Sequence, residues 1–173
     1  MDSNDQERFF DWFAGFVAGE GSFQIRQRSD GSFICELAIL LRDDDLSMLI
    51  KIQETLGMGT LHRGPSRRLN QNPQALWRVC GIDDLVRLVE IFDTHSIRAK
   101  KQGDYEIWRD AVLEISKGRA RLNKSGWRTN YDREYLNYLA EKLKIVRGYN
   151  GPEPDEYEPE AEQLELGFYA KKP

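Results

Sequence analysis

The apolar residues of the chain follow two different periods, and these predict where helices and strands lie. Within positions 6–19 they recur at helical spacing, which predicts a first helix, at Phe9, Phe10, Phe13, Phe16 and Val17. Positions 22–28 alternate between apolar and polar side chains, which is typical of a strand with one solvent-exposed face. Positions 33–41 are more uniformly apolar, so this second strand should lie inside its sheet. The Asp30-Gly31 pair between the two strands predicts a β-hairpin.

Further along the chain, the same patterns predict one more helix, a second pair of strands and three helices. We expect these elements at positions 46–56, 59–63, 75–80, 82–93, 101–115 and 132–147. The order is αββαββα followed by further helices, which indicates the α+β class. We assign residues 1–150 to one domain and residues 151–173 to an acidic tail, rich in Pro and Glu, that is too polar to pack.

The distribution of charge changes what the net charge of −4 suggests about partners. Residues 151–173 carry seven acidic and two basic side chains, whereas residues 98–150 carry 13 basic and seven acidic ones. A chain that is acidic overall therefore has a basic region that permits a polyanion-binding face.

Several broad classes are excluded by the sequence. No apolar run approaches the length of about 20 residues that a membrane span requires. Residues 1–8 are polar and acidic, unlike a secretory signal, so we expect an intracellular protein that is not secreted. Cys35 and Cys80 are too few for a disulfide framework or a zinc site, and we expect both to be small core residues.

The segment FAGFVAGEG at positions 13–21 carries the chemistry. Its small residues form two pairs, each four positions apart, at Ala14, Gly15, Ala18 and Gly19. Such residues let two helix backbones approach closely, as in membrane helix pairs. Because Gly inside a helix costs about 1 kcal/mol relative to Ala, a partner helix is the simplest reason for Gly15.

Glu20 follows at the C-terminal end of this predicted helix, where the helix dipole disfavours an anion. A carboxylate at that position makes sense if a cation accompanies it. Where two copies of the helix meet, their two Glu20 carboxylates converge and can hold a hard divalent ion such as Mg²⁺.

FAGFVAGEG followed by Ser22 resembles the LAGLIDADG motif of homing endonucleases, and the αββαββα order resembles that family's core over roughly residues 8–115. The resemblance implies a saddle-shaped antiparallel sheet that binds double-stranded DNA. It also implies metal-dependent hydrolysis of both strands at a long pseudo-palindromic target in intron homing. Because the chain has one motif, it implies a homodimer in contact through the motif helices. It places such a protein in prokaryotic cytoplasm or an organelle.

The resemblance also implies roles for individual residues. Glu20 coordinates the catalytic metal, Mg²⁺ or another divalent cation, assisted by the backbone carbonyl of Gly19. The active-site lysine is either Lys100 or Lys101. Arg42 is the nearest match to the residue that orders the hydrolytic water, and Leu41 is the alternative at that position.

DNA contacts are expected from two groups of residues. The alternation of the strands points one set toward the major groove, namely Gln24, Arg26, Arg28, His62 and Arg78. Predicted loops supply a second set that holds phosphates, namely Arg67, Arg68, Lys117, Arg119, Arg121, Lys124 and Arg128.

Two alternatives stay open. One is a non-cleaving nucleic-acid-binding protein with the same fold, such as an intron maturase or a transcription regulator. The other is an α+β interaction domain that shares the motif by chance, and the charge distribution argues against it.

Overall fold

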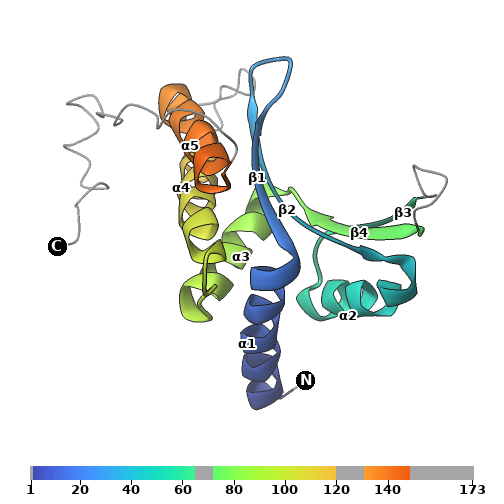
Figure 1. Ribbon diagram of the computed structural model, residues 1–173. Helices are drawn as coiled ribbons and strands as arrows, with labels where there is room; N and C mark the ends of the chain where they lie inside the picture. Colours follow the sequence, from blue (N-terminus) through green and yellow to red (C-terminus); the bar gives the residue numbers. More distant parts are fainter. Residues whose placement is uncertain (1, 65–71, 120–130, 149–173) are drawn as a thin grey trace.

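The computed structural model describes residues 2–64, 72–119 and 131–148, and these form an α+β domain (Figure 1). The predicted tail at 151–173 lies outside the described residues. In chain order the elements are α1 (Ser3–Glu20), β1 (Gly21–Gln27), β2 (Phe33–Arg42), the short 3₁₀ turn η1 (Asp43–Asp45), α2 (Leu46–Leu56), β3 (Thr60–Gly64), β4 (Gln74–Val79), α3 (Ile82–Thr94), α4 (Lys101–Arg119) and α5 (Arg133–Val146).

The four strands form one antiparallel sheet in the order β1-β2-β4-β3, which confirms that the apolar strand β2 is central. The predicted hairpin turn joins β1 to β2. Gly31 adopts a φ of 78°, a backbone conformation that glycine tolerates at no steric cost. Asp30 Oδ1 accepts hydrogen bonds from the hydroxyl of Ser32 at 2.6 Å and from its backbone N–H at 2.9 Å. These bonds hold the pKa of Asp30 below its usual value.

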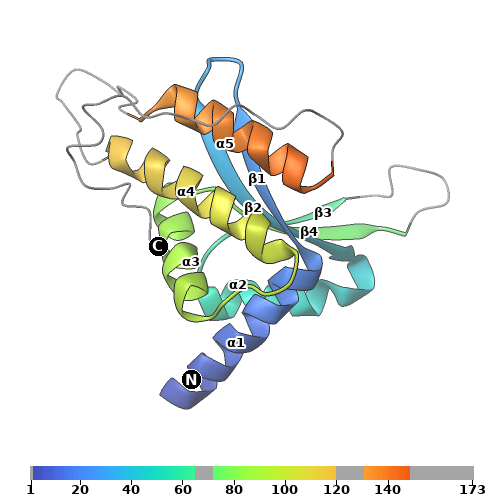
Figure 2. The same cartoon turned by 60° about the vertical axis from the view of Figure 1, so that its left-hand side comes forward.

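The two faces of the sheet differ in character because side chains alternate along each strand. One face packs on α1, α2, α3 and α4 and forms the core, in which Phe13, Phe23, Trp77 and Trp108 are fully buried. The opposite face, called the open face below, carries polar residues of all four strands together with apolar ones such as the exposed Leu40. The sheet is strongly curved, since the β1–β2 hairpin stands upright while β3 and β4 lie across it (Figures 1 and 2).

Helix α5 runs along β1, which is one edge of the sheet (Figure 2). At the hairpin end, the backbone N–H of Phe33 donates to the Tyr131 hydroxyl at 2.9 Å, and Arg133 donates to the carbonyl of Gly31 at 2.7 Å. At the opposite end, Arg147 donates to the carbonyl of Phe23. Both ends of the helix are therefore tied to the hairpin.

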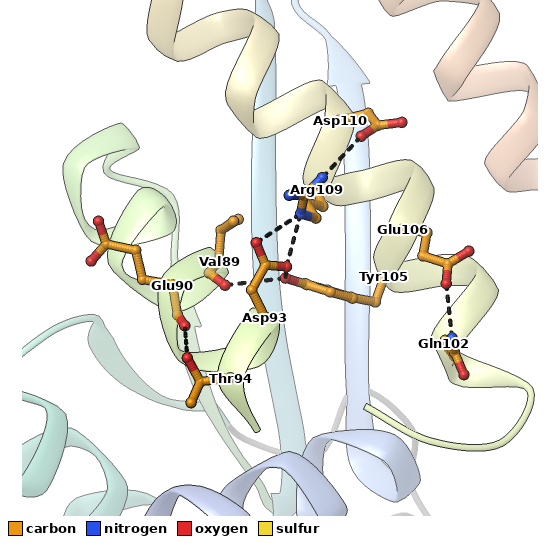
Figure 3. A network of polar contacts seen from close by, with 9 residues as sticks. All are labelled: Val89, Glu90, Asp93, Thr94, Gln102, Tyr105, Glu106, Arg109 and Asp110. Atoms are coloured by element: carbon orange, nitrogen blue, oxygen red, sulfur yellow. Dashed lines mark hydrogen bonds and ion pairs between the residues drawn. The ribbon is translucent and has the colours of Figure 1, made fainter. Parts of the chain in front are cut away.

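Helices α3 and α4 are joined by a polar network around Asp93 (Figure 3). The Tyr105 hydroxyl lies 2.7 Å from Asp93 Oδ1 and 3.2 Å from the carbonyl oxygen of Val89, and Arg109 Nε donates to the same Asp93 oxygen at 2.8 Å. Burial, together with the Asp93 carboxylate, raises the pKa of Tyr105. The phenol therefore stays protonated and available as a donor between the two helices.

The Tyr105→Phe substitution is expected to lower the free energy of unfolding by about 1–2 kcal/mol, because it removes the part-buried hydrogen bond to Asp93 and the buried contact with the Val89 carbonyl without leaving a cavity. Urea denaturation of the two proteins measures the difference. Equal unfolding midpoints with equal slopes would show that this hydroxyl contributes nothing to the packing of α3 on α4.

Two expectations from the sequence are corrected by the structure. Helix α4 extends to Arg119, beyond the predicted end at residue 115. Cys35 is buried as expected, but Cys80 is exposed because β4 ends at Val79 and Cys80 lies in the connection to α3. Within the described ranges, none of the helices is both long enough and apolar enough to cross a membrane.

Candidate functional site

The candidate site begins at the last residue of α1, Glu20, as the sequence predicted. Its side chain is exposed, and it forms no ion pair with any residue that the structure describes. The last turn of α1 contains no basic residue, so nothing in the helix itself offsets the carboxylate or the negative end of the dipole. The carbonyl of Gly19 lies in this last turn, where carbonyls lack an intrahelical donor. The helix end therefore offers two kinds of oxygen ligand to a cation.

The position of Glu20 is fixed by an abrupt change from helix to strand. Gly21 already belongs to β1 and is buried against α1. A Cβ at position 21 would lie 2.6 Å from both the carbonyl oxygen and Cγ1 of Val17. Only glycine allows this close approach, so the carboxylate is held at a rigid junction rather than in a loop.

The four small residues of α1 do not share one free face, which corrects the sequence-based expectation. Ala14 is only 2% exposed because it packs into the chain's own core, and Ala18 is half-buried. Gly15 and Gly19 are exposed, and a Cβ added to either would meet nothing within 4 Å. Of the four small residues, only these two glycines therefore belong to a free stripe on α1.

Two aromatic residues extend this free stripe along α1. Trp12 is 39% exposed and stacks on Phe16, with ring centroids 5.1 Å apart. Trp12 lies three positions before Gly15 and Phe16 lies three positions before Gly19, which puts the aromatic residues next to the glycines on the helix surface. The stripe of Trp12, Gly15, Phe16 and Gly19 is thus an apolar surface with the two glycines along one side and the partly exposed Phe16 on the other.

The two candidate lysines have different environments. Lys100 is exposed, whereas Lys101 is half-buried at the start of α4, with its Nζ 3.5 Å from Oδ2 of the buried Asp104. Asp104 Oδ2 also accepts from Arg147 Nε at 3.1 Å, and Arg147 donates to the carbonyl of Phe23.

These contacts link Lys101 to the strand that follows Glu20. Phe23 lies only three positions after Glu20, so the chain of contacts ties the first turn of α4 to the start of β1. Helices α1 and α4 are in contact, and the beginning of α4 lies beside the junction of α1 and β1 (Figure 2). The sequence did not single out Asp104 or Arg147, although the three-residue spacing from Lys101 to Asp104 on a helix was a usable signal.

Arg42 lies at the end of β2, where the sequence placed it, and is largely exposed. Its guanidinium donates two hydrogen bonds to the Asp44 carboxylate, from Nη2 at 2.6 Å and from Nε at 3.1 Å. Leu41, the alternative at this position, is half-buried and packs against the core. The water-ordering role of Arg42 stays a prediction.

The open face brings together most of the strand residues predicted to contact DNA. Pairing and alternation place Gln24, Arg26, Arg78 and His62 on this face. Arg28 is different, because β1 ends at Gln27 and Arg28 belongs to the exposed hairpin turn. The structure adds Glu36 at the centre of the face, a residue that the sequence analysis missed although an acid inside an apolar strand is itself a signal.

The predicted basic loop is partly helical. Lys117 and Arg119 belong to α4, and Lys117 Nζ lies 2.8 Å from the nearly buried Glu114, which also accepts a hydrogen bond from the backbone of Asp132. These contacts of Glu114 explain why α4 continues to Arg119, although the helical spacing of apolar residues ends at residue 115. The remaining predicted phosphate contacts lie outside the described residues, namely Arg67, Arg68, Arg121, Lys124 and Arg128.

Across the described ranges, no three His, Cys, Asp or Glu side chains gather closely enough to hold a metal ion. One chain thus brings a single carboxylate, Glu20, to the end of α1. Hard divalent cations take six or more oxygen ligands, so a cation there needs further ligands from outside this group.

Comparison with known proteins gives one family for this chain. The family model described as LAGLIDADG endonuclease matches residues 13–112. The chain is 29% identical over 126 residues to "Probable intron-encoded endonuclease 4" of Neurospora crassa, and 27% identical over 109 residues to "Probable intron-encoded endonuclease Cox1-I1b" of Schizosaccharomyces pombe. These alignments cover 73% and 61% of this chain but only 22% and 27% of the relatives. The chain therefore spans about a quarter of the length of the curated relatives that it matches.

Solved structures show the same fold. The LAGLIDADG meganuclease I-AabMI bound to uncleaved DNA matches with a TM-score of 0.60 and 23% identity, over 92% of this chain and 48% of that one. I-SmaMI bound to an uncleaved DNA target in the presence of calcium ions matches with a TM-score of 0.60 and 19% identity, over 84% and 51%. The homing endonuclease I-TnaI matches with a TM-score of 0.54 and 21% identity, over 78% of this chain and 97% of that one.

Proposed function

Because the chain belongs to the LAGLIDADG endonuclease family, we propose that it is a homing endonuclease that cuts both strands of DNA at one long, specific site. The observation that carries the proposal is the position of Glu20, an exposed carboxylate without an ion pair in the described structure, at the end of the motif helix. The names of the two curated relatives support intron homing as the biological setting.

We propose that two copies of the chain form the active enzyme through the free stripe of α1. The two exposed glycines allow the helices to approach closely, and Trp12 and Phe16 supply apolar area around them. An isologous dimer brings both Glu20 carboxylates to one place and favours a pseudo-palindromic target. The near-complete coverage of I-TnaI supports a unit of this size.

The residues at the end of α1 fit a hard divalent cation, for which we propose Mg²⁺. Carboxylate and carbonyl oxygens are the ligands that such cations prefer, and Glu20 and Gly19 supply both. A bound divalent cation would lower the pKa of an attacking water and neutralise charge on the scissile phosphate. The rigid junction at Gly21 holds the Glu20 carboxylate in a fixed position for this task.

Lys101, rather than Lys100, is the lysine that we assign to the site. Its ammonium is already held by Asp104 beside the start of β1, so little conformational entropy is lost when it acts. From that position its charge offsets the negative charge that develops on the phosphate oxygens during hydrolysis.

DNA binding is assigned to the open face. A curved antiparallel sheet with outward polar side chains can follow the major groove, in which every base pair presents its own pattern of donors and acceptors. Basic residues on its flanks hold phosphates, so affinity should fall as the salt concentration rises.

The experiment that tests the function is incubation of the protein with a library of DNA duplexes and Mg²⁺, followed by sequencing of the ends. We expect both strands to be cut at one recurring site. Enrichment of a bound sequence without any cut ends would instead establish the alternative of a non-cleaving binding protein. A protein that neither binds nor cuts any duplex in the library would refute the proposal.

The two lysines make a sharp comparison. Lys101→Met is expected to slow cleavage roughly a hundredfold, the effect typical of removing one group that stabilises developing charge. Lys100→Met should change the rate by less than about threefold because that side chain is exposed and rim charges contribute little. Single-turnover cleavage rates of both variants measure this, and the reverse ranking would transfer the role to Lys100.

A further inference from the structure

Glu36 occupies an unexpected position for a surface that binds a polyanion. It lies in the middle of the central strand β2, on the open face, and is only 6% exposed. Among the described strand residues of that face it is the one acidic side chain. Burying a carboxylate is costly, and a negative charge here repels phosphate, so its presence needs a local reason.

The local reason is a pair of arginines from the two neighbouring strands. Arg26 on β1 donates from Nη2 to Glu36 Oε2 at 2.9 Å, and Nη1 of Arg78 on β4 lies 3.8 Å from the same oxygen. Both arginines are diagonal neighbours of Glu36 in the sheet, a separation that long side chains can span. One carboxylate therefore organises two guanidinium groups across three strands.

The arginines keep much of their surface free. Their side chains are 50% and 40% exposed, for Arg26 and Arg78 respectively, while the carboxylate beneath them is almost covered. Arg78 has in addition a buried Nε without a hydrogen-bond partner in the described structure. Both arginine side chains thus keep exposed surface for a ligand, whereas Glu36 itself is too covered to contact one.

We propose that Glu36 is a specificity-determining positioning residue, which orients Arg26 and Arg78 so that they read base edges instead of binding phosphates. The inference rests on the proposed function, since it assumes that the open face binds DNA. Without the carboxylate, two like-charged side chains would lie side by side with nothing to fix their rotamers. Each would then turn toward the nearest phosphate, because phosphate contacts need no particular side-chain geometry.

The test is selection of bound sequences from a pool of randomised DNA duplexes, in EDTA so that none is cut, with wild-type protein and Glu36→Gln. Glutamine keeps the shape and removes the charge. We expect Glu36→Gln to lose about tenfold of discrimination at the base pairs affected by Arg26→Gln or Arg78→Gln. Its affinity for unrelated DNA should fall more steeply with salt, by roughly one unit of slope. Glu90→Gln, an exposed change of the same kind on α3, is the matched control and should behave as wild type.

Other outcomes separate the two proposals. A wild-type protein that selects no sequence would overturn the DNA-binding function, and this inference with it. A selected wild-type site together with an unchanged base profile for folded Glu36→Gln would overturn the inference alone, leaving Glu36 as a purely structural link. If Glu36→Gln does not fold, Arg26→Gln decides the matter: coupling through Glu36 predicts that it also alters preference at the base pairs read by Arg78, whereas independent effects contradict it. Glu36→Asp, which keeps the charge, should retain most of the wild-type profile.

Discussion

Cleavage by the Glu20→Gln variant is expected to be at least roughly a hundredfold slower than wild type in Mg²⁺, while its affinity for the same DNA stays within about threefold. Glutamine preserves the length and shape of the side chain but removes the charge that binds a hard cation. Because Glu20 is exposed and forms no ion pair in the described structure, the substitution leaves no partner unsatisfied. The fold should therefore be unaffected, and the loss is one of chemistry.

The comparison needs both readouts on the same preparation, namely single-turnover cleavage and equilibrium binding in EDTA. Glu54→Gln, an exposed carboxylate on α2, is the matched control. Mg²⁺ binding followed by calorimetry with uncut DNA gives a further readout, and should be weaker for Glu20→Gln than for the control. Wild-type cleavage by Glu20→Gln would remove Glu20 from the metal site.

Gly15→Leu is expected to separate folding from assembly. A side chain at Gly15 meets nothing within 4 Å inside the chain, so the monomer has room for it. Leucine also raises helix propensity by up to about 1 kcal/mol relative to glycine, so the monomer should be no less stable. In the dimer the same side chain enters the contact from both copies. Overpacking of about 1–3 kcal/mol for each copy then weakens dimerisation by roughly thirtyfold or more.

Sedimentation at several concentrations measures the dimerisation constant, and thermal unfolding measures the monomer. Gly64→Leu introduces the same side chain into open space at the end of β3, far along the chain from α1, and should leave the dimer intact. A wild-type protein that stays monomeric at micromolar concentration, with and without DNA, would rule out this mode of assembly.

Much of the fold was predictable because its signals are local. Asp30-Gly31 predicted the hairpin, the apolar run at 33–41 predicted the central strand, and both were confirmed. Glu20 was placed correctly at the end of α1 because helix periodicity stops there. Local pattern is sufficient wherever neighbours in sequence determine the outcome.

The remaining features depend on contacts between distant segments. Ala14 and Gly15 are adjacent in sequence, and only the packing of α1 on the sheet decides that the first is buried and the second is free. Lys117 looks like a loop residue by composition, yet Glu114 keeps it in α4. The role proposed for Glu36 depends on its ion pair with Arg78, which is 42 positions later in the chain. The pairing of β2 with β4 brings the two residues together.

The placement of α5 along β1 has a consequence for how the molecule avoids self-association. β1 is an outermost strand, and outermost strands present unpaired backbone groups that recruit strands from other molecules. Arg147 donates a hydrogen bond to the carbonyl of Phe23, and Arg133 donates one to the carbonyl of Gly31 at the hairpin tip. Between these two points α5 lies against β1. The helix thus protects β1 from pairing with strands of other molecules, and it leaves the exposed side of α1 uncovered for the dimer contact that we propose.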